Sequence, residues 1–293
     1  MRQLSSKARA QILHLLCEGN SIRSVVRLTG ASKNTVVKLL TDAGRVCAEY
    51  QDRVFRDLPC RRIQVDEIWS FVYAKQKNVA RAKAAPEWAG DVWTWTAIDA
   101  ETKLVPSWLV GGRDAEYAMA FMDDLASRLA RRVQITSDGH SAYLQAVEGA
   151  FGADVDYAML VKLYGTAPES AKGRYSPAEC IGARKTRIEG NPDPKHVSTS
   201  YAERQNLTQR MLNRRFTRLT NAFSKKVENH EHSVALHFMY YNFVRIHRTL
   251  KVTPAMAAGV TDRLWEINDI VALLEAKEAD LPRARGPYKK NAA

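Results

Sequence analysis

The pattern of apolar residues changes at Arg62, and this change separates two parts of the chain that must fold differently. Before Arg62, apolar side chains recur every three to four positions, which is the spacing of one face of an α-helix. After it come runs such as IQVDEIWSFVY and DVWTWTAID, and their β-branched and aromatic residues are typical of strands. We therefore expect a helical N-terminal part followed by a part built on a β-sheet.

The second part shows predicted strands and helices in an order that favours one fold class. Three strand-like runs, a helical run, a further strand and a further helix follow one another: IQVDEIWSFVY, DVWTWTAID, KLVPSWLVG, AEYAMAFMDDLASRLA, RVQITSD and SAYLQAVEGAF. Such an order is typical of a mixed sheet with helices packed on it. The predicted fold class is α/β, with a mixed sheet and flanking helices preceded by an all-α domain.

Residues 152–198 carry weaker signals than the segments around them. DYAMLVKLY has the composition of a strand, whereas GTAPESAKGRYSPAEC and EGNPDPKH are rich in turn-forming residues. Beyond them, one long helix is predicted from Ser200 to Lys226 and another over HEHSVALHFMYYNFVRIHRTL. The C-terminal LPRARGPYKKNAA is predicted to be a basic, disordered tail.

Residues 5–44 predict three short helices with tight turns between them. A serine precedes each helix, Ser5 or Ser6 before the first, Ser21 before the second and Ser32 before the third, and serine is favoured at the N-cap. Two short helices joined by a glycine-containing turn are the sequence form of a helix-turn-helix. The alternative is a three-helix bundle used for packing or dimerisation.

In a helix-turn-helix, the N-terminal polar residues of the third helix would face the DNA major groove. These residues are Lys33, Asn34, Thr35 and Lys38. After this helix, residues 46–59 read as a linker helix that a proline ends.

The charge balance favours a polyanionic partner. The 44 Lys and Arg residues against 32 Asp and Glu residues give a net charge of +12 and an isoelectric point near 9.6. Nucleic acid is favoured over a membrane, because no run approaches the roughly 18 apolar residues of a membrane span. A ribosomal protein, or a merely solubilising excess of charge, is the alternative.

Zinc and disulfide frameworks are not indicated. The cysteines form no Cys-x-x-Cys pair, and the histidines lack ligand spacing, so the latter are interpreted as packing or phosphate-contact residues. These residues are Cys17, Cys47, Cys60, Cys180, His140, His237 and His247. With reduced thiols and no export signal at the N-terminus, a cytoplasmic protein is expected.

Three carboxylates lie in settings that suit a metal-dependent phosphoryl-transfer site. Asp66 lies mid-strand among apolar neighbours, an unfavourable place for a charge without a partner or ligand. Asp138 ends a predicted strand, and Glu203 opens a predicted helix. Two divalent cations held by a few carboxylates supply the chemistry of phosphodiester cleavage.

Each acid has a structural alternative. Asp138 also suits an ordinary turn, and Glu203 suits a helix N-terminus, where it interacts with the helix dipole. Glu67 should point to the opposite face of the strand from Asp66 and is the weaker candidate. Asp99 is the substitute for Asp138, although its context reads more simply as a hairpin turn.

The helix that Glu203 opens is strongly basic, which suits a DNA-facing surface. Asn206 and Arg210 lie three and seven positions beyond Glu203. They therefore share its helical face and would be aimed at a DNA phosphate. A solvated basic face is the alternative. The predicted DNA-binding residues in this region are Arg204, Asn206, Arg210, Arg214 and Arg215.

Four motifs together resemble a known group of proteins. They are VDEIWSFV, SDGHSAYLQAV, STSYAERQNLTQRM with RRFTRLTNAFSKK, and YYNFVRIHRTL followed by TPAMAAG, covering roughly residues 62–260. In combination they are similar to DDE transposases of bacterial insertion sequences, most closely the insertion-sequence-one family. The zinc-binding module that often precedes the helix-turn-helix in this family has no counterpart here.

The resemblance implies a ribonuclease H-like catalytic domain in which Asp66, Asp138 and Glu203 bind two Mg²⁺ ions, with Mn²⁺ as an alternative. It also implies cleavage at inverted-repeat ends, followed by attack of the freed 3′-hydroxyl on target DNA. The resulting hypothesis is a transposase that acts on DNA as a homo-oligomer. The alternative enzyme is a nuclease or resolvase-like protein on the same fold. The alternative of a different class is a non-catalytic DNA-binding repressor, or a decayed transposase, on the same fold.

The predicted domain organisation follows these assignments. It consists of a helix-turn-helix domain over residues 1–50, a linker over 51–61, the catalytic domain over 62–260, and a C-terminal helix and tail over 261–293.

Overall fold

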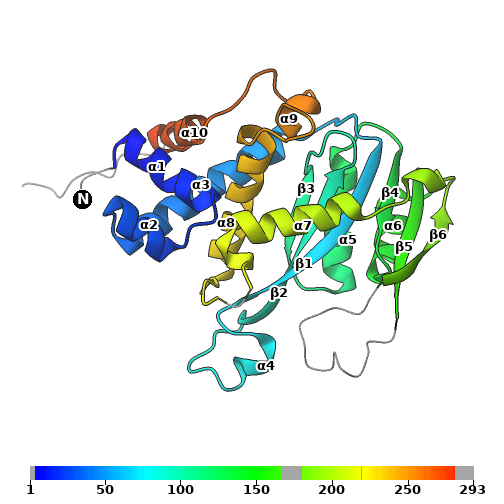
Figure 1. Cartoon of the computed structure of the whole chain (residues 1–293), viewed down its shortest axis with the longest axis horizontal. Helices are drawn as coiled ribbons and strands as arrows, with labels where there is room; N and C mark the ends of the chain where they lie inside the picture. Colours follow the sequence, from blue (N-terminus) through cyan, green and yellow to red (C-terminus); the bar gives the residue numbers. More distant parts are fainter. Residues whose placement is uncertain (1–3, 166–179, 219, 281–293) are drawn as a thin grey trace, which may run out of the picture.

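The computed structural model describes residues 4–165, 180–218 and 220–280 (Figure 1). Most of the turn-rich segment GTAPESAKGRYSPAEC and all of the tail LPRARGPYKKNAA lie outside these residues, as do the predictions made for them.

The N-terminal part consists of three helices, as predicted. They are α1 (Ser6–Cys17), α2 (Ile22–Thr29) and α3 (Lys33–Val54). The side chains of Ser5, Ser21 and Ser32 each accept a hydrogen bond from a backbone N–H in the first turn of the following helix, which confirms them as N-caps. Gly30 ends α2 in the left-handed conformation, with φ of 70°, a conformation that glycine adopts without strain.

The predicted third helix and the first part of the predicted linker helix are one continuous element. α3 runs for 22 residues and packs along α8 (Val227–Met239). A Cβ at Gly44 of α3 would lie 2.3 Å from the backbone oxygen of His232, so a larger residue there would force the two helices apart. The long α3 thus carries the N-terminal helices directly on the rest of the protein.

The strands of the described residues form one six-stranded mixed sheet in the order β3-β2-β1-β4-β5-β6, which confirms the α/β class. β1, β4 and β5 are parallel, and each other strand is antiparallel to the neighbour it pairs with. The strands are β1 (Arg62–Val72), β2 (Gly90–Asp99), β3 (Ser107–Gly111), β4 (Val133–Ser137), β5 (Val155–Tyr164) and β6 (Cys180–Glu189).

β5 confirms the strand predicted over DYAMLVKLY, whereas β6 was not predicted. β6 is an edge strand, and most of its residues are exposed whichever face of the sheet they lie on. Its sequence CIGARKTRIE therefore lacks the alternation of apolar and polar residues by which a half-buried strand is recognised.

Helices cover both faces of the sheet. On one face, Ile63 and Val65 belong to an apolar cluster with residues of α5 (Ala115–Arg128) and α6 (Ala142–Phe151). On the other, Ile68 packs in a cluster with residues of α8 and of α7 (Ser200–Leu212), which crosses β1 in Figure 1. Odd-numbered residues of β1 therefore face α5 and α6, and even-numbered residues face α7.

The helix predicted from Ser200 to Lys226 is wrong in its second half, because α7 ends at Leu212. Asn213 adopts an extended backbone, and its buried side chain donates to the backbone oxygen of Ser233 and accepts from the hydroxyl of the same residue. These bonds to α8 replace continuation of the helix. A short 3₁₀ turn, Arg214–Phe216, follows.

The helix predicted over HEHSVALHFMYYNFVRIHRTL is also shorter than expected. It begins as α8, changes to a π-helical turn over Tyr240–Val244 and ends there, with Arg245 extended. The side-chain amide of Asn242 is buried. It accepts a hydrogen bond from the backbone N–H of Val105 and donates one to the backbone oxygen of the same residue, both at 3.0 Å. The π-turn is thus fixed to the turn between β2 and β3.

The remaining helical elements are short or peripheral. They are α4 (Gln76–Val79), the 3₁₀ turn Pro194–His196, α9 (Pro254–Ala257) and α10 (Ile267–Asp280). α10 packs on α1 and α3. In the part of the chain that the structure describes, none of the helices combines the length and apolar content that a membrane crossing requires.

Candidate active site

The register of the two central parallel strands brings Asp66 and Asp138 together. Gln64 of β1 pairs with Thr136 of β4, 72 positions later, and every other pair in this ladder has the same separation. Asp66 and Asp138 are also 72 positions apart, so Asp138 follows β4 at the level of Asp66. Carboxyl ends of adjacent parallel strands in an open α/β sheet are the usual place for a ligand site.

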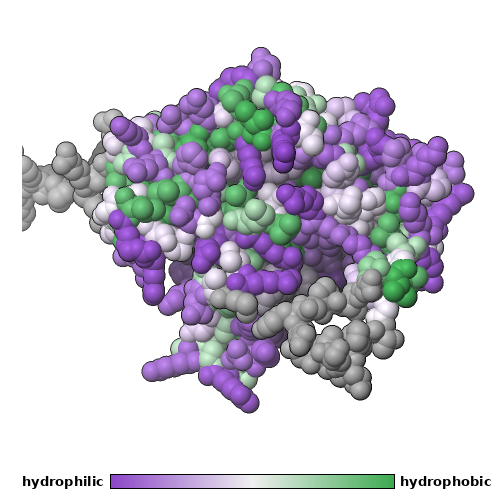
Figure 2. Space-filling view, viewed as in Figure 1, coloured by the Kyte–Doolittle hydropathy of each residue, from purple (hydrophilic) through white to green (hydrophobic). Residues whose placement is uncertain are grey.

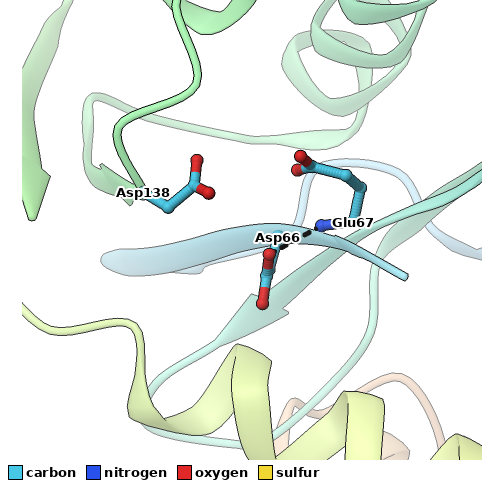
Figure 3. A group of neighbouring side chains, drawn as sticks. All are labelled: Asp66, Glu67 and Asp138. Atoms are coloured by element: carbon cyan, nitrogen blue, oxygen red, sulfur yellow. Dashed lines mark hydrogen bonds between the residues drawn. The ribbon is translucent and has the colours of Figure 1, made fainter. Parts of the chain in front are cut away.

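Asp66 points from β1 toward α7 (Figure 3). Its Oδ1 accepts a hydrogen bond from the backbone N–H of Glu67 at 2.9 Å, and its Oδ2 accepts one from Nδ2 of Asn206 at 2.8 Å. Burial, and then the charges of Glu67, Asp138 and Glu203, raise the pKa of Asp66 to about 7. A group with this pKa is destabilised as an anion at neutral pH and would be relieved by a cation.

Glu67 leaves β1 on the opposite face, as predicted (Figure 3). Its buried carboxylate accepts from the hydroxyl of Tyr143 at 2.9 Å and forms an ion pair with Arg113, whose Nη2 lies 2.6 Å from Oε1. Even so, one oxygen each of Asp66, Glu67 and Asp138 lie within 4.8 Å of one another. The rule that successive side chains of a strand point to opposite faces therefore did not predict how close Glu67 lies to the other two acids.

Glu203 lies in the first turn of α7, as predicted, but its carboxylate is engaged elsewhere. Oε1 accepts from the hydroxyl of Thr199 at 2.7 Å, and Oε2 pairs with Nζ of Lys162 at 2.5 Å. Burial lowers the pKa of Lys162, but the hydrogen bond and charge of Glu203 outweigh this effect and raise it overall. Glu203 is thus close enough to act on Asp66 but is not in the acidic group defined above.

One cavity of about 650 Å³ joins the three predicted acids. Asp66, Asp138 and Glu203 all line it, and so do Arg113 and Lys162. Arg113 is held by Glu67 and stacks on Trp93, with its guanidinium carbon 4.7 Å from the ring centroid. The cavity therefore offers carboxylates beside two cations, a combination suited to a phosphate group with divalent metal.

The residues present fit a divalent cation of the Mg²⁺ type. The donor set is made of carboxylate oxygens, which hard cations prefer. Burial and the neighbouring acids raise the pKa of Asp66, so a bound cation would stabilise its anionic form. Asp66 and Asp138 would hold the cation. Glu203 would join them once its carboxylate exchanged the ammonium of Lys162 for the cation.

Arg113, Lys162 and Tyr143 were not predicted as site residues. Arg113 follows two glycines, the first of which is the last residue of β3, and Lys162 lies in a predicted strand among apolar residues. A lysine within an otherwise apolar strand was the available signal for Lys162. No sequence signal marked Tyr143, because its position in the apolar pattern of α6 is that of an ordinary core residue.

Asn206 and Arg210 lie on the predicted face of α7 but differ in their surroundings. Asn206 is buried and donates to Asp66. Arg210 is half-buried; burial and the charge of Arg218 lower its pKa, while the charge of Asp66 acts in the opposite direction. Both therefore lie near Asp66, and their contact with DNA stays a prediction.

Two predicted DNA-binding surfaces meet in one groove of about 700 Å³. Helix α3 and the segment after α7 both line it, and Arg23 and Lys225 add further positive charge. Thr35 is not among its lining residues; its hydroxyl bonds the cap residue Ser32 at 2.9 Å. The predicted residues that line the groove are Lys33, Asn34, Lys38, Arg214 and Arg215. The face of the molecule seen in Figure 2 is mainly hydrophilic, with scattered hydrophobic residues.

Arg215 is half-buried and is held by a neighbouring side chain. Burial lowers its pKa to about 10, and its Nε donates to the hydroxyl of Ser224 at 2.7 Å. This bond ties the segment after α7 together, so a structural role accompanies any contact with DNA.

Asp99, the substitute for Asp138, has the structural role that its sequence suggested. It is buried, and its Oδ2 accepts from the backbone N–H of Thr102 at 2.8 Å and from the hydroxyl of the same residue at 2.6 Å. It therefore organises the turn after β2. His140 lines the acidic cavity and stacks on Trp95, with ring centroids 5.8 Å apart.

No protein-family model and no curated protein matches this sequence. Among solved structures, a piggyBac transposase synaptic complex with hairpin DNA matches at 8% identity with a TM-score of 0.40, over 97% of this chain and 75% of the other. The Mos1 strand transfer complex matches at 13% identity and a TM-score of 0.24, over 80% and 78% of the two chains. The Mos1 paired-end complex matches at 14% and 0.22, over 54% and 60%.

Proposed function

We propose that this protein is a DNA transposase with a ribonuclease H-like catalytic domain, most similar to the insertion-sequence-one family. The observation that carries the proposal is the closeness of the Asp66 carboxylate on β1 to that of Asp138, directly after the adjacent parallel strand β4, with Glu203 lining the same cavity. Cations at the rim of an acidic cavity suit a DNA phosphate better than a neutral substrate.

The residues have separate roles in this proposal. Asp66 and Asp138 hold the metal, Asn206 orients Asp66, and Glu203 completes the ligand set. Mg²⁺, as two ions or replaced by Mn²⁺, would supply an activated oxygen nucleophile and a stabilised leaving oxygen. Arg113, fixed by Glu67, contributes a rigid guanidinium for a phosphate oxygen.

DNA recognition is assigned to the N-terminal helices and the basic segment after α7. α2 and α3 form a helix-turn-helix that binds inverted-repeat ends, and the start of α3 lines the same groove as the basic segment after α7. Joining two DNA ends to a target takes more than one active site, so the working form is a homo-oligomer on DNA.

A cleavage and strand-transfer assay tests the proposal. Purified protein is incubated with labelled DNA that spans the boundary of its gene, with and without Mg²⁺. Nicks at the element boundary and joined products are expected only with metal, and they should disappear in Asp66→Asn, Asp138→Asn and Glu203→Gln. Glu148→Gln, an exposed acid of α6, is the matched control. Undiminished cleavage by the three variants contradicts the site assignment.

A non-catalytic DNA-binding repressor is the second candidate. The ion pair between Glu203 and Lys162 favours it, because Glu203 is occupied by a protein cation. The same assay separates the two functions, since a repressor binds the DNA ends but yields no metal-dependent products.

A further inference from the structure

A second cavity, of about 160 Å³, lies on the other side of α7 from the acidic site. Tyr201, Arg204, Gln205 and Thr208 of α7 line it, whereas Glu203 and Asn206 face Asp66. Spacings of three and four residues place each set on its own face of the helix. One helix therefore borders both cavities.

The second cavity is lined by cations and by no carboxylate. Lys103 comes from the turn between β2 and β3, Arg204 from α7, and the rest from the chain after the π-turn: Arg245, His247 and Arg248. Within the described ranges, none of these residues forms an ion pair with an acidic residue. Clustered positive charge without compensation is unfavourable unless an anion binds.

Lys103 is the most informative of these cations. It is only 8% exposed, and its Nζ donates to the backbone oxygen of Ala100, a neutral acceptor that leaves the positive charge without a counter-ion. Its Nζ lies 3.2 Å from the ring centroid of Tyr201, and its backbone φ is +62°, a strained value for a residue other than glycine. The hydroxyl of Tyr241 donates to its backbone oxygen at 3.1 Å, and Asn242 fixes the same turn at Val105.

A neutral donor in the same cavity is also unused. Gln205 is 2% exposed and lines the cavity, and its Nε2 has no hydrogen-bond partner in the described part of the chain. A buried amide donor without an acceptor is unfavourable. The cavity thus combines positive charge with a free donor, and its volume is several times the roughly 30 Å³ that one water occupies in the liquid.

We propose that this cationic pocket binds a backbone phosphate of the DNA that the protein processes. A single phosphate suits the arrangement, because a compact oxyanion can accept from the arginines and from Gln205 together. The pocket gives the motif YYNFVRIHRTL a role. Tyr241 and Asn242 hold the turn that carries Lys103. The basic residues of the motif that complete the pocket are Arg245, His247 and Arg248. The assignment of the phosphate to DNA rests on the proposed function; the pocket itself does not.

Salt dependence of DNA binding tests the pocket. A labelled 30-base-pair duplex is titrated with the full-length protein without divalent metal, at several salt concentrations. Arg245→Gln with Arg248→Gln should weaken binding and reduce the steepness of log K against log[salt] by about one, since one lost phosphate contact lowers the slope by about one. Arg131→Gln, an exposed arginine outside the pocket, should leave both unchanged.

Ethylation interference locates the contact. One or a few phosphates whose ethylation weakens binding by the wild-type protein should lose that effect in the double variant. Arg204→Gln provides an independent variant on α7 if the double variant does not fold, which thermal unfolding shows.

His247 gives a readout that does not depend on activity. Burial, and then the charges of Lys103, Arg245 and Arg204, lower the pKa of His247. A phosphate bound among these cations should raise the pKa, which NMR titration of the histidine ring measures with and without the duplex. The rise should be absent in the double variant.

The outcomes separate this inference from the proposed function. Wild-type protein that binds DNA, with slope and ethylation pattern unchanged in both folded variants, overturns the pocket alone. Protein that shows the expected slope change but never cuts DNA overturns the transposase proposal and supports the pocket. Wild-type protein that binds no DNA overturns both.

Discussion

Asn206 donates from Nδ2 to Oδ2 of Asp66 at 2.8 Å, a hydrogen bond that joins α7 to β1. The same side chain was predicted to contact a DNA phosphate. The two roles make different predictions for the rate of cleavage and for the affinity for DNA.

Asn206→Ala should lower the cleavage rate by about 10- to 100-fold, which is typical for loss of a residue that orients a metal ligand. The affinity for DNA should stay within about twofold, because the buried amide is already engaged with Asp66. Single-turnover rates and binding titrations measure the two effects, with Gln145→Ala on the exposed side of α6 as control. A parallel loss of affinity and rate would instead favour the phosphate contact.

Arg113 and Glu67 should act as one unit. The guanidinium is held by Glu67 Oε1 through Nε at 2.7 Å and Nη2 at 2.6 Å, so Glu67→Gln and Arg113→Gln should each lower the cleavage rate by about tenfold or more. The double variant should be little worse than either single variant, because residues in one ion pair are not additive. Single-turnover cleavage measures the rates; full additivity would separate Glu67 from the function of Arg113.

Lys162→Met should increase the affinity for metal. Glu203 loses its protein cation and becomes available to Mg²⁺ or Mn²⁺, so the metal concentration at half-saturation should fall severalfold. Calorimetric titration without DNA measures this directly. Lys195→Met, an exposed lysine of the Pro194–His196 turn, is the control. An unchanged or weaker affinity would mean that Lys162 does not compete for Glu203.

The pH dependence of stability should reflect Asp66. Its folded pKa of about 7 lies above its ordinary value of 3.8, so between these pH values the folded protein binds more protons than the unfolded chain. Stability must therefore fall as pH rises through this window. Without metal, Asp66→Asn should raise the melting temperature by a few degrees at pH 8 and by much less at pH 4. A similar change at both pH values would contradict the raised pKa.

Local chemistry explains which parts of the fold could be predicted. The serine caps and the glycine after α2 act within one helical turn. The helix ends that they mark can therefore be recognised from the sequence; these residues are Ser5, Ser21, Ser32 and Gly30. Composition likewise identifies β1, because β-branched and aromatic residues favour strands. The end of α7 is different: Asn213 is fixed by Ser233 of another helix, a contact that nearby residues do not encode.

The candidate site divides in the same way. Asp66 is conspicuous because it is a charge among apolar residues, whereas its nearness to Asp138 depends on the pairing of β1 with β4. The engagement of Glu67 by Arg113 and of Glu203 by Lys162 depends on tertiary packing. The sequence therefore allowed us to name three acids that line one cavity, but not the cations that share it, and the roles of these acids stay a prediction.

The two interleaved faces of α7 have a consequence for how this protein can vary. A substitution on one face alters one cavity and leaves the other in place. A single-residue insertion between Thr199 and Glu203 would instead rotate all later helical residues by about 100° and shift them by about 1.5 Å along the axis, turning Asn206 away from Asp66 and Gln205 away from the cationic pocket together. The length of this helix segment is thus under a stricter constraint than its composition, and changes in length there should be tolerated far less than point substitutions.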